Sequence, residues 1–437
     1  MKRRMQKMDR YLPIRDLFAR EIIDAVGSPA VEVEMLTDEN IVGTASISLT
    51  EHVRGADRME SSQESLHSKG TGAVSAAYAV ENINCFIAQK LIGINVVDQA
   101  EIDRALFQMN ETTDGNLSSG SVTMAVSAAA ARTAASALDI PLYRYLGGTQ
   151  AVKMPTPIVD VITGGPYVRN MPDFRGFMVI PLAEGAFHEK LRTCIQVYHE
   201  LERILRSKGA EHMQECKNDM QPVIRDAQEA LALIRSAVEH AAYPADRGVG
   251  IVLDIDASAM YDMRSKTYTF PSEGRKRGCM LQRTTEEMME YYRKIISEFP
   301  VFSIEDPFAP EDRNGWENLS PSLSDKVQIV SGNPSFVDFD RKGVPERKNA
   351  VVRIDVGKAE TVTNIFDQIK KARETGALIE ITHMGNWTAD TLAADVAVAA
   401  GAGYIRAGLP RGIENAEKYN RLLKIEEQFP FYPSMRG

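Results

Sequence analysis

Six short apolar runs in the C-terminal two-thirds of the chain each carry a polar, mostly ionisable residue at or near their C-terminal end. Continuous apolar runs are typical of parallel strands that are buried on both faces of a sheet. The runs recur roughly 20 to 50 residues apart with helical patterns between them, as expected for the units of a (β/α) barrel. They cover residues 251–254, 301–305, 327–333, 351–353, 378–383 and 404–406. The sequence therefore predicts a barrel whose polar strand ends share one mouth; the alternative is a set of unrelated charges in solvent.

The length and charge of the chain limit the class of protein. A chain of 437 residues is too long for one ordinary core and predicts two domains. Its formal net charge of -9 argues against a nucleic-acid partner, because phosphate neutralisation requires clustered Lys and Arg. No apolar stretch reaches the length of a membrane span, and the widely separated cysteines suit neither a zinc site nor a disulfide framework. We therefore expect a cytoplasmic protein with no membrane or nucleic-acid partner.

The N-terminal part of the chain has a different pattern from the rest. Residues 30–35 alternate as a half-buried strand does, and residues 41–49 have the pattern of its antiparallel partner. The Ala-rich segments 72–91 and 122–138 contain no proline and predict helices. A small sheet followed by helices indicates an α+β domain.

A cluster of turn-forming residues between Pro141 and Pro157 marks the expected domain boundary. We predict an N-terminal domain over residues 1–148 and a barrel domain over residues 149–437. Within the barrel domain, residues 228–241 and 286–299 carry apolar residues at helical spacing. They are expected to be barrel helices that pack on the strands.

Several collinear segments that span nearly the whole chain match one known family. They are residues 27–34, 79–84, 91–93, 98–99, 141–143, 164–165, 173–181, 303–306, 325–330 and 418–427. In these segments the chain resembles enolase. The resemblance implies an α/β fold, an enolase-type α/β barrel with an α+β N-terminal capping domain, that is usually assembled as a homodimer.

Enolases convert 2-phosphoglycerate to phosphoenolpyruvate with the help of magnesium, and the resemblance assigns the metal-binding positions to three residues. The carboxylates of the family align with Asp254, Glu305 and Asn333. Asn333 offers a carbonyl oxygen but no negative charge, so the three magnesium-binding side chains carry one negative charge fewer than in the family. We therefore expect magnesium binding to be weakened or lost.

The resemblance also places altered residues at the catalytic positions. Arg353 stands where the family has its catalytic lysine, and a guanidinium does not release its proton in a folded protein. One catalytic glutamate of the family is Gly176 here, and the other falls near Lys217. We therefore expect neither the base nor the acid of enolase to work at its usual place.

Residues that hold the substrate in the family have changed as well. Tyr167 replaces a histidine, while His383 is kept without the arginine and serine that follow it in the family's phosphate clamp. Arg406 replaces the second lysine and keeps its charge. The candidate catalytic residues are thus His383, Arg353, Lys217 and Tyr167, and the candidate substrate-binding residues are Arg406, Arg353 and His383.

Three functions remain open from the sequence. The first is an enolase-like protein without normal dehydration activity, which acts as a binding, regulatory or assembly partner. The second is a divergent lyase that uses His383, Tyr167 or Lys217 on a small anionic ligand drawn by Arg353 and Arg406. The third is an ordinary magnesium-dependent enolase.

The balance of charges gives one further hypothesis. Fixed cations now face the two remaining metal carboxylates, so Arg353 or Lys217 is expected to pair with Asp254 or Glu305 and replace the metal, because buried unpaired carboxylates are costly. In the alternative, Asp254 and Glu305 persist only because the barrel tolerates them. Separately, the changed catalytic and substrate-holding residues predict no dehydration of 2-phosphoglycerate above background with magnesium.

Overall fold

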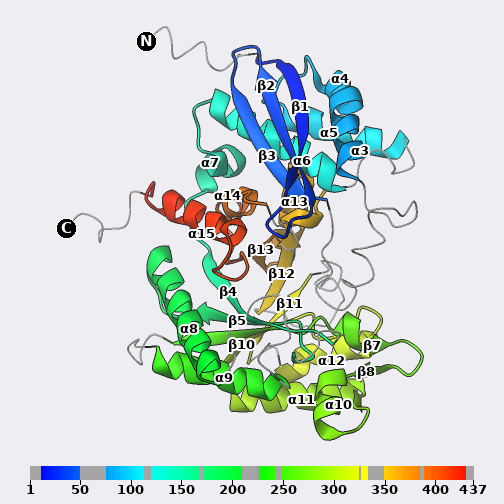
Figure 1. Ribbon diagram of the computed structural model, residues 1–437, viewed down its shortest axis with the longest axis vertical. Coiled ribbons are helices and arrows are strands. Elements are labelled where there is room, and N and C mark those ends of the chain that lie inside the picture. Colours follow the sequence, from blue (N-terminus) through cyan, green and yellow to red (C-terminus); the bar gives the residue numbers. More distant parts are fainter. Residues whose placement is uncertain are drawn as a thin grey trace, which may run out of the picture.

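The computed structural model describes residues 11–49, 75–112, 120–166, 171–208, 224, 226–241, 248–323, 326–332, 349–383 and 388–429. Its N-terminal sheet and helices, coloured blue and cyan, lie at one end of the long axis (Figure 1). A closed barrel with its surrounding helices forms the rest of the described chain.

The N-terminal sheet has three antiparallel strands in the order β1-β2-β3. They are β1 (Ile14–Ile23), β2 (Pro29–Thr37) and β3 (Val42–Ser48). Buried and more exposed residues alternate along β2, which means that one face of the sheet is covered. The antiparallel pair expected for residues 30–35 and 41–49 is confirmed.

Helices cover the buried face of this sheet or pack on the helices that do so. They are α3 (Ala76–Asn82), the π-helical turn η1 (Ile83–Ile87), α4 (Ala88–Leu91), α5 (Gln99–Thr112), α6 (Gly120–Ala137) and α7 (Leu142–Gly147). The small residues of α6 let the sheet approach closely: a β-carbon on Gly43 of β3 would lie 2.4 Å from the backbone nitrogen of Thr133. The Ala-rich pattern of α6 therefore serves close packing against the strands.

The barrel consists of eight strands, of which β5 runs antiparallel to both of its neighbours. The strands are β4 (Thr156–Thr163), β5 (Gly176–Pro181), β6 (Val249–Asp254), β10 (Val301–Glu305), β11 (Gln328–Ser331), β12 (Ala350–Asp355), β13 (Leu378–Thr382) and β14 (Tyr404–Arg406). All six apolar runs singled out in the sequence contain or lie within barrel strands. The predicted fold, an α/β barrel with an α+β capping domain, is confirmed.

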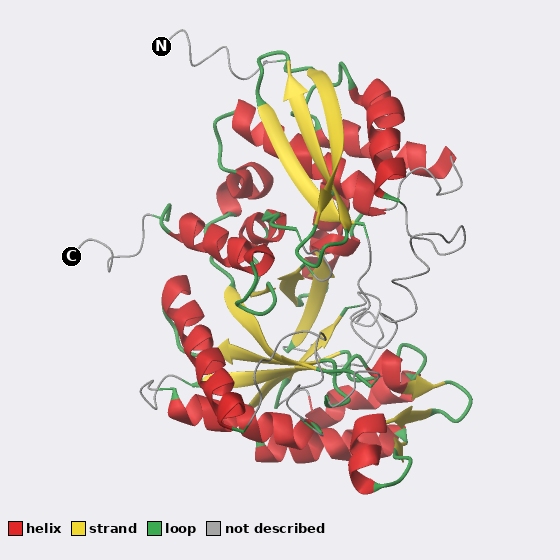
Figure 2. Ribbon diagram, in the orientation of Figure 1, coloured by secondary structure: helices red, strands yellow, loops and turns green. Residues whose placement is uncertain are grey.

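The barrel is surrounded by helices, and a small module of three short strands and one helix is attached to one side (Figure 2). The helices are α8 (Phe187–Ser207), α9 (Ala227–His240), α11 (Thr285–Glu298), α12 (Arg313–Leu323), α13 (Val362–Glu374), α14 (Leu392–Ala399) and α15 (Ile413–Glu426). The module comprises β7 (Tyr261–Asp262), β8 (Thr267–Thr269), α10 (Pro271–Arg277) and β9 (Gln282–Arg283). The helices predicted at residues 228–241 and 286–299 correspond to α9 and α11.

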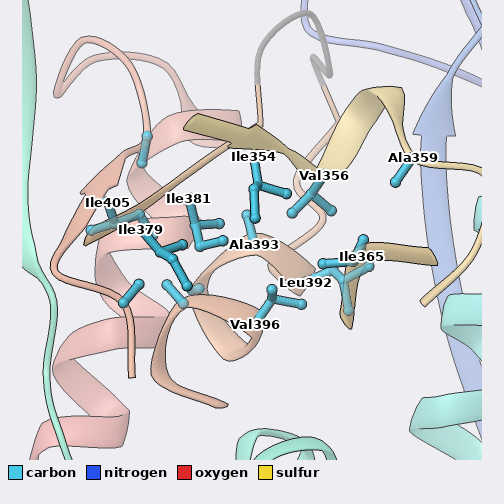
Figure 3. Close-up of a cluster of buried hydrophobic side chains, with 14 of the residues drawn as sticks. Ile354, Val356, Ala359, Ile365, Ile379, Ile381, Leu392, Ala393, Val396 and Ile405 are labelled. Atoms are coloured by element: carbon cyan, nitrogen blue, oxygen red, sulfur yellow. The ribbon is translucent and has the colours of Figure 1, made fainter. Parts of the chain in front are cut away.

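Alternate strand residues point outward into an apolar layer between strands and helices. Figure 3 shows this layer, with Ile381 of β13 and Ile405 of β14 facing Leu392 and Val396 of α14. Because side chains alternate along a strand, the residues next to Ile381, which are Glu380 and Thr382, point into the barrel. The same alternation places the polar residues of the other strands inside.

Polar contacts join the capping domain to the barrel. Arg132 of α6 forms a bidentate ion pair with Asp390, at 2.6 and 2.9 Å. Asp103 of α5 accepts from the backbone nitrogen of Thr363 at 2.9 Å. These contacts tie α6 to the loop that follows β13, and α5 to the first turn of α13. Among the described helices, none combines the length and the apolar character needed to cross a membrane.

Candidate functional site

Four of the residues singled out in the sequence meet inside the barrel. Asp254 and Glu305 end β6 and β10, and Arg353 and Arg406 lie on β12 and β14. Both carboxylates are fully buried. They come together because the C-terminal ends of barrel strands point into one mouth.

Arg406 lies at the centre of three carboxylates. Its Nη1 donates to Asp254 Oδ2 at 2.8 Å and to Glu305 Oε2 at 3.0 Å. Its Nη2 donates to Asp160 Oδ1 at 2.7 Å, and Nε also donates to that carboxylate. Burial disfavours the charged guanidinium, but these carboxylates outweigh it and hold the pKa of Arg406 well above its ordinary value. Every nitrogen of the guanidinium is therefore engaged by the chain itself.

Arg353 binds the Glu305 oxygen that Arg406 also binds, and one oxygen of a further carboxylate. Its Nη1 donates to Glu305 Oε2 at 2.8 Å, and its Nη2 donates to Asp306 Oδ2 at 2.7 Å. Asp306 has a φ of 42°, in the left-handed region that residues other than glycine rarely adopt. The ion pair expected between Arg353 and Glu305 is thus present, and Glu305 Oε2 accepts from both arginines.

Two glycines make room for these guanidinium groups. A β-carbon on Gly332, directly after β11, would lie 2.5 Å from Arg353 Nη2. A β-carbon on Gly176, at the start of β5, would lie 3.3 Å from Arg406 Nη2 and 3.5 Å from Asp254 Cβ. A larger side chain at either glycine would therefore compete with an arginine for space.

The carboxyl groups of Asp254 and Glu305, which both bind Arg406, have opposite pKa shifts. Burial would raise the pKa of Asp254, but the neighbouring guanidinium groups, Arg406 first among them, lower it to about 2. Burial raises the pKa of Glu305 to about 7, against the attraction of Arg406. Asp254 Oδ1 and Glu305 Oε1 have no hydrogen-bond partner within the described part of the chain.

The described residues do not fit a magnesium ion at this position. No group of three or more His, Cys, Asp or Glu side chains in the described ranges is arranged to hold a metal. Arg406 already holds one oxygen of both Asp254 and Glu305. Two unit charges 4 Å apart interact by about 4 kcal/mol at an effective dielectric constant of about 20, so a divalent ion beside one guanidinium meets roughly twice that repulsion.

His383 lies in a different electrostatic environment. It follows β13, and neither ring nitrogen has a hydrogen-bond partner in the described structure. Burial, followed by the charge of Lys418, lowers the pKa of His383 to about 3, so the imidazole is neutral. Asp390 and Arg132, which join the capping domain to the barrel, are the other charges that act on it.

The remaining candidates are Tyr167, Lys217 and Asn333, which lie outside the described residues. Their assigned roles stay predictions. Met384 and Gly385, at the altered phosphate clamp, also fall outside the described ranges.

Sequence reasoning missed Asp160 as a member of the site. Asp160 is the one ionisable residue within β4, Thr156–Thr163, and it accepts from Arg406. A charged residue in the middle of an apolar run was a usable signal. Glu380 in β13 carries the same signal, because it too is an acid inside an apolar strand.

Two family models match the chain. The model of the enolase N-terminal domain matches residues 14–146, and that of the enolase C-terminal TIM barrel domain matches residues 151–434. The chain belongs to the enolase family. This enolase-family protein therefore has the expected fold. Inside its barrel, Arg353 and Arg406 bind the carboxylates of Glu305 and Asp254. The domain boundary between residues 148 and 149 stays a prediction.

Proposed function

We propose that this enolase-family protein does not dehydrate 2-phosphoglycerate and acts instead as a non-catalytic binding, regulatory or assembly partner. One observation carries the proposal: Arg406 and Arg353 together bind the carboxylates of Asp254 and Glu305. Fixed guanidinium groups there take the place of a metal ion.

The loss of the base supports the same conclusion. A general base must release and accept a proton near the working pH. The neighbouring carboxylates hold the pKa of Arg353 far above that range, although burial acts in the opposite direction. Gly176 has no side chain that could act as the acid. General acid–base groups are commonly worth about 10² to 10⁴ in rate each.

A divergent lyase that acts on a small anionic ligand is less well supported. All three guanidinium nitrogens of Arg406 donate hydrogen bonds to carboxylates of the chain. Both Nη atoms of Arg353 do the same. An incoming anion would have to displace buried carboxylates, whose release from their ion pairs is costly. The third function, ordinary magnesium-dependent catalysis, requires a metal cage that the described residues do not form.

Family membership supports two further parts of the proposal. We expect the protein to form a homodimer, as enolases often do, and to be cytoplasmic. Sedimentation of the purified chain tests the first expectation, and fractionation of the producing cells tests the second.

The test of function is a dehydration assay on the full chain. Purified protein with magnesium and 2-phosphoglycerate is expected to form no phosphoenolpyruvate above the buffer background, while an active enolase assayed in parallel forms it readily. Titration calorimetry with magnesium is expected to show no tight binding. A turnover number within about a hundredfold of the active enolase would overturn the proposal.

A further inference from the structure

Glu380 is a fully buried acid that the arginines do not bind. It is the middle residue of β13 and points into the barrel, with no exposed surface. Neither of its carboxyl oxygens has a hydrogen-bond partner among the described residues. In the strand register it lies between Arg353 of β12 and Tyr404 of β14.

The charged groups that face Glu380 come from four other strands. They are Glu305 of β10, Arg353 of β12, Arg406 of β14 and Asp254 of β6. The titratable Tyr404 of β14 also faces it, and the hydroxyl of Tyr404 accepts from the Gln328 amide at 2.9 Å. Both acids and arginines surround Glu380. Whether an arginine neutralises Glu380 therefore depends on which hydrogen bonds each arginine makes.

Within the described part of the chain, the cations near Glu380 already bind other acids. All three nitrogens of Arg406 donate to Asp160, Asp254 or Glu305. Both Nη atoms of Arg353 donate to carboxylates other than Glu380. An ionised carboxylate without a partner costs several kcal/mol when buried, and the nearby negative charge of Glu305 would increase that cost.

We infer that Glu380 is a protonated carboxylic acid at neutral pH, a buried proton-binding site that completes the charge balance of the barrel interior. Its pKa is raised well above the ordinary value, first by burial and then by Glu305. The inference rests on the surroundings of Glu380 and does not depend on the proposed function.

The proton also adds one hydrogen-bond donor to the barrel interior. The buried oxygens without a partner in the described barrel interior include the acceptors Asp254 Oδ1, Glu305 Oε1 and Gln328 Oε1, beside the hydroxyl of Thr382, which can also donate. A neutral carboxylic acid contributes one O–H donor, whereas a carboxylate contributes another acceptor. Protonation of Glu380 therefore adds a donor to an interior in which several acceptor oxygens have no partner among the described residues.

Infrared spectroscopy tests the inference on the full chain. The C=O stretching band of a protonated carboxylic acid is expected in the wild-type protein at about pH 8.5, above the pKa of about 7 for Glu305. The band should shift in D₂O and be absent in Glu380→Gln. The control Glu290→Gln changes an exposed carboxylate and should keep the band. Absence of the band from the wild type, or its persistence in Glu380→Gln, would overturn the inference.

A second measurement separates a bound proton from a bound cation. If a cation balanced Glu380, added potassium, sodium or magnesium would stabilise the wild type but not Glu380→Gln, and that outcome would contradict the inference. We expect these salts at matched ionic strength to affect both proteins equally. Should Glu380→Gln fail to fold, a ¹³C carboxyl titration of the wild type is expected to show one glutamate still protonated at that pH.

Discussion

The guanidinium of Arg353 occupies the space that a side chain on Gly332 would need, since a β-carbon there would lie 2.5 Å from Arg353 Nη2. The backbone nitrogen of Gly332 also donates to Asp306 Oδ1 at 2.9 Å, and Arg353 binds the other oxygen of the same carboxylate. Gly332 and Arg353 therefore bind the same carboxylate, and the Arg353 side chain fills the space beside Gly332. A change at either residue should alter the effect of a change at the other.

A double-mutant cycle tests this coupling. Gly332→Asp in the wild-type background is expected to cost about 1–3 kcal/mol of unfolding free energy, because Arg353 must move and a carboxylate approaches Asp306. In the Arg353→Lys background, which has a slimmer cation, the same change should cost at least about 1 kcal/mol less. Urea unfolding of the four proteins measures both values.

Gly332→Ala provides the steric control for this cycle. It adds the β-carbon without a charge, so its cost should be smaller than that of Gly332→Asp and should also fall in the Arg353→Lys background. Strictly additive costs would show that Arg353 and Gly332 are independent, contrary to the structure.

Arg406 is predicted to replace a metal ion in stabilising the barrel. Arg406→Met leaves the buried carboxylates of Asp160, Asp254 and Glu305 without their shared cation, which is expected to cost about 3–5 kcal/mol. Millimolar magnesium should restore part of this loss, because a divalent ion can then approach the freed oxygens. The same magnesium concentration should leave the wild type unchanged.

Arg406→Lys is the matched variant for this prediction. A lysine keeps the charge but cannot match the planar fork that binds several carboxylates, so an intermediate loss and a smaller magnesium effect are expected. Thermal unfolding of the wild type, Arg406→Lys and Arg406→Met, with and without magnesium, ranks their stabilities and the effect of the ion on each. Equal magnesium effects on wild type and Arg406→Met would contradict the replacement of the metal.

Much of the barrel could be predicted because continuous apolar runs are a direct consequence of burial on both faces. The search for polar residues at the ends of apolar runs found Asp254, Glu305 and Arg406, and each of them is the last residue of its strand. It missed Asp160, which lies within β4. Strands in a closed barrel are staggered, so the middle of one strand can lie level with the end of another.

The partners of the charges could be predicted only in part. The resemblance and the balance of charges indicated that Arg353 or Lys217 would pair with Asp254 or Glu305, and the structure places Arg353 beside Glu305. The resemblance made Arg406 a candidate substrate-binding residue, and in the structure its nitrogens bind carboxylates of the chain. Which donor meets which oxygen depends on side-chain geometry across the barrel, which sequence spacing does not contain.

The pKa shifts of the buried acids predict a protein that is most stable in mildly acidic solution. The pKa of Glu305 is raised by burial from 4.5 to about 7, so the folded state binds the proton more tightly than the unfolded state. Its contribution is fully present below about pH 4.5 and is lost as the pH rises to about 7, by roughly 3 kcal/mol. Asp254, lowered from 3.8 to about 2, acts in the other direction and loses its contribution as the pH falls through about 2.

Urea unfolding at about pH 5 and about pH 8 measures this dependence, and the unfolding free energy is expected to be lower at the higher pH. Glu305→Gln should reduce the difference because the amide does not titrate, although the variant also weakens the bonds to Arg353 and Arg406 at both pH values. The control Glu290→Gln, at an exposed carboxylate, should keep the wild-type difference. An unfolding free energy that rises between the two pH values would mean that Glu305 is ionised throughout, with the arginines outweighing the effect of its burial.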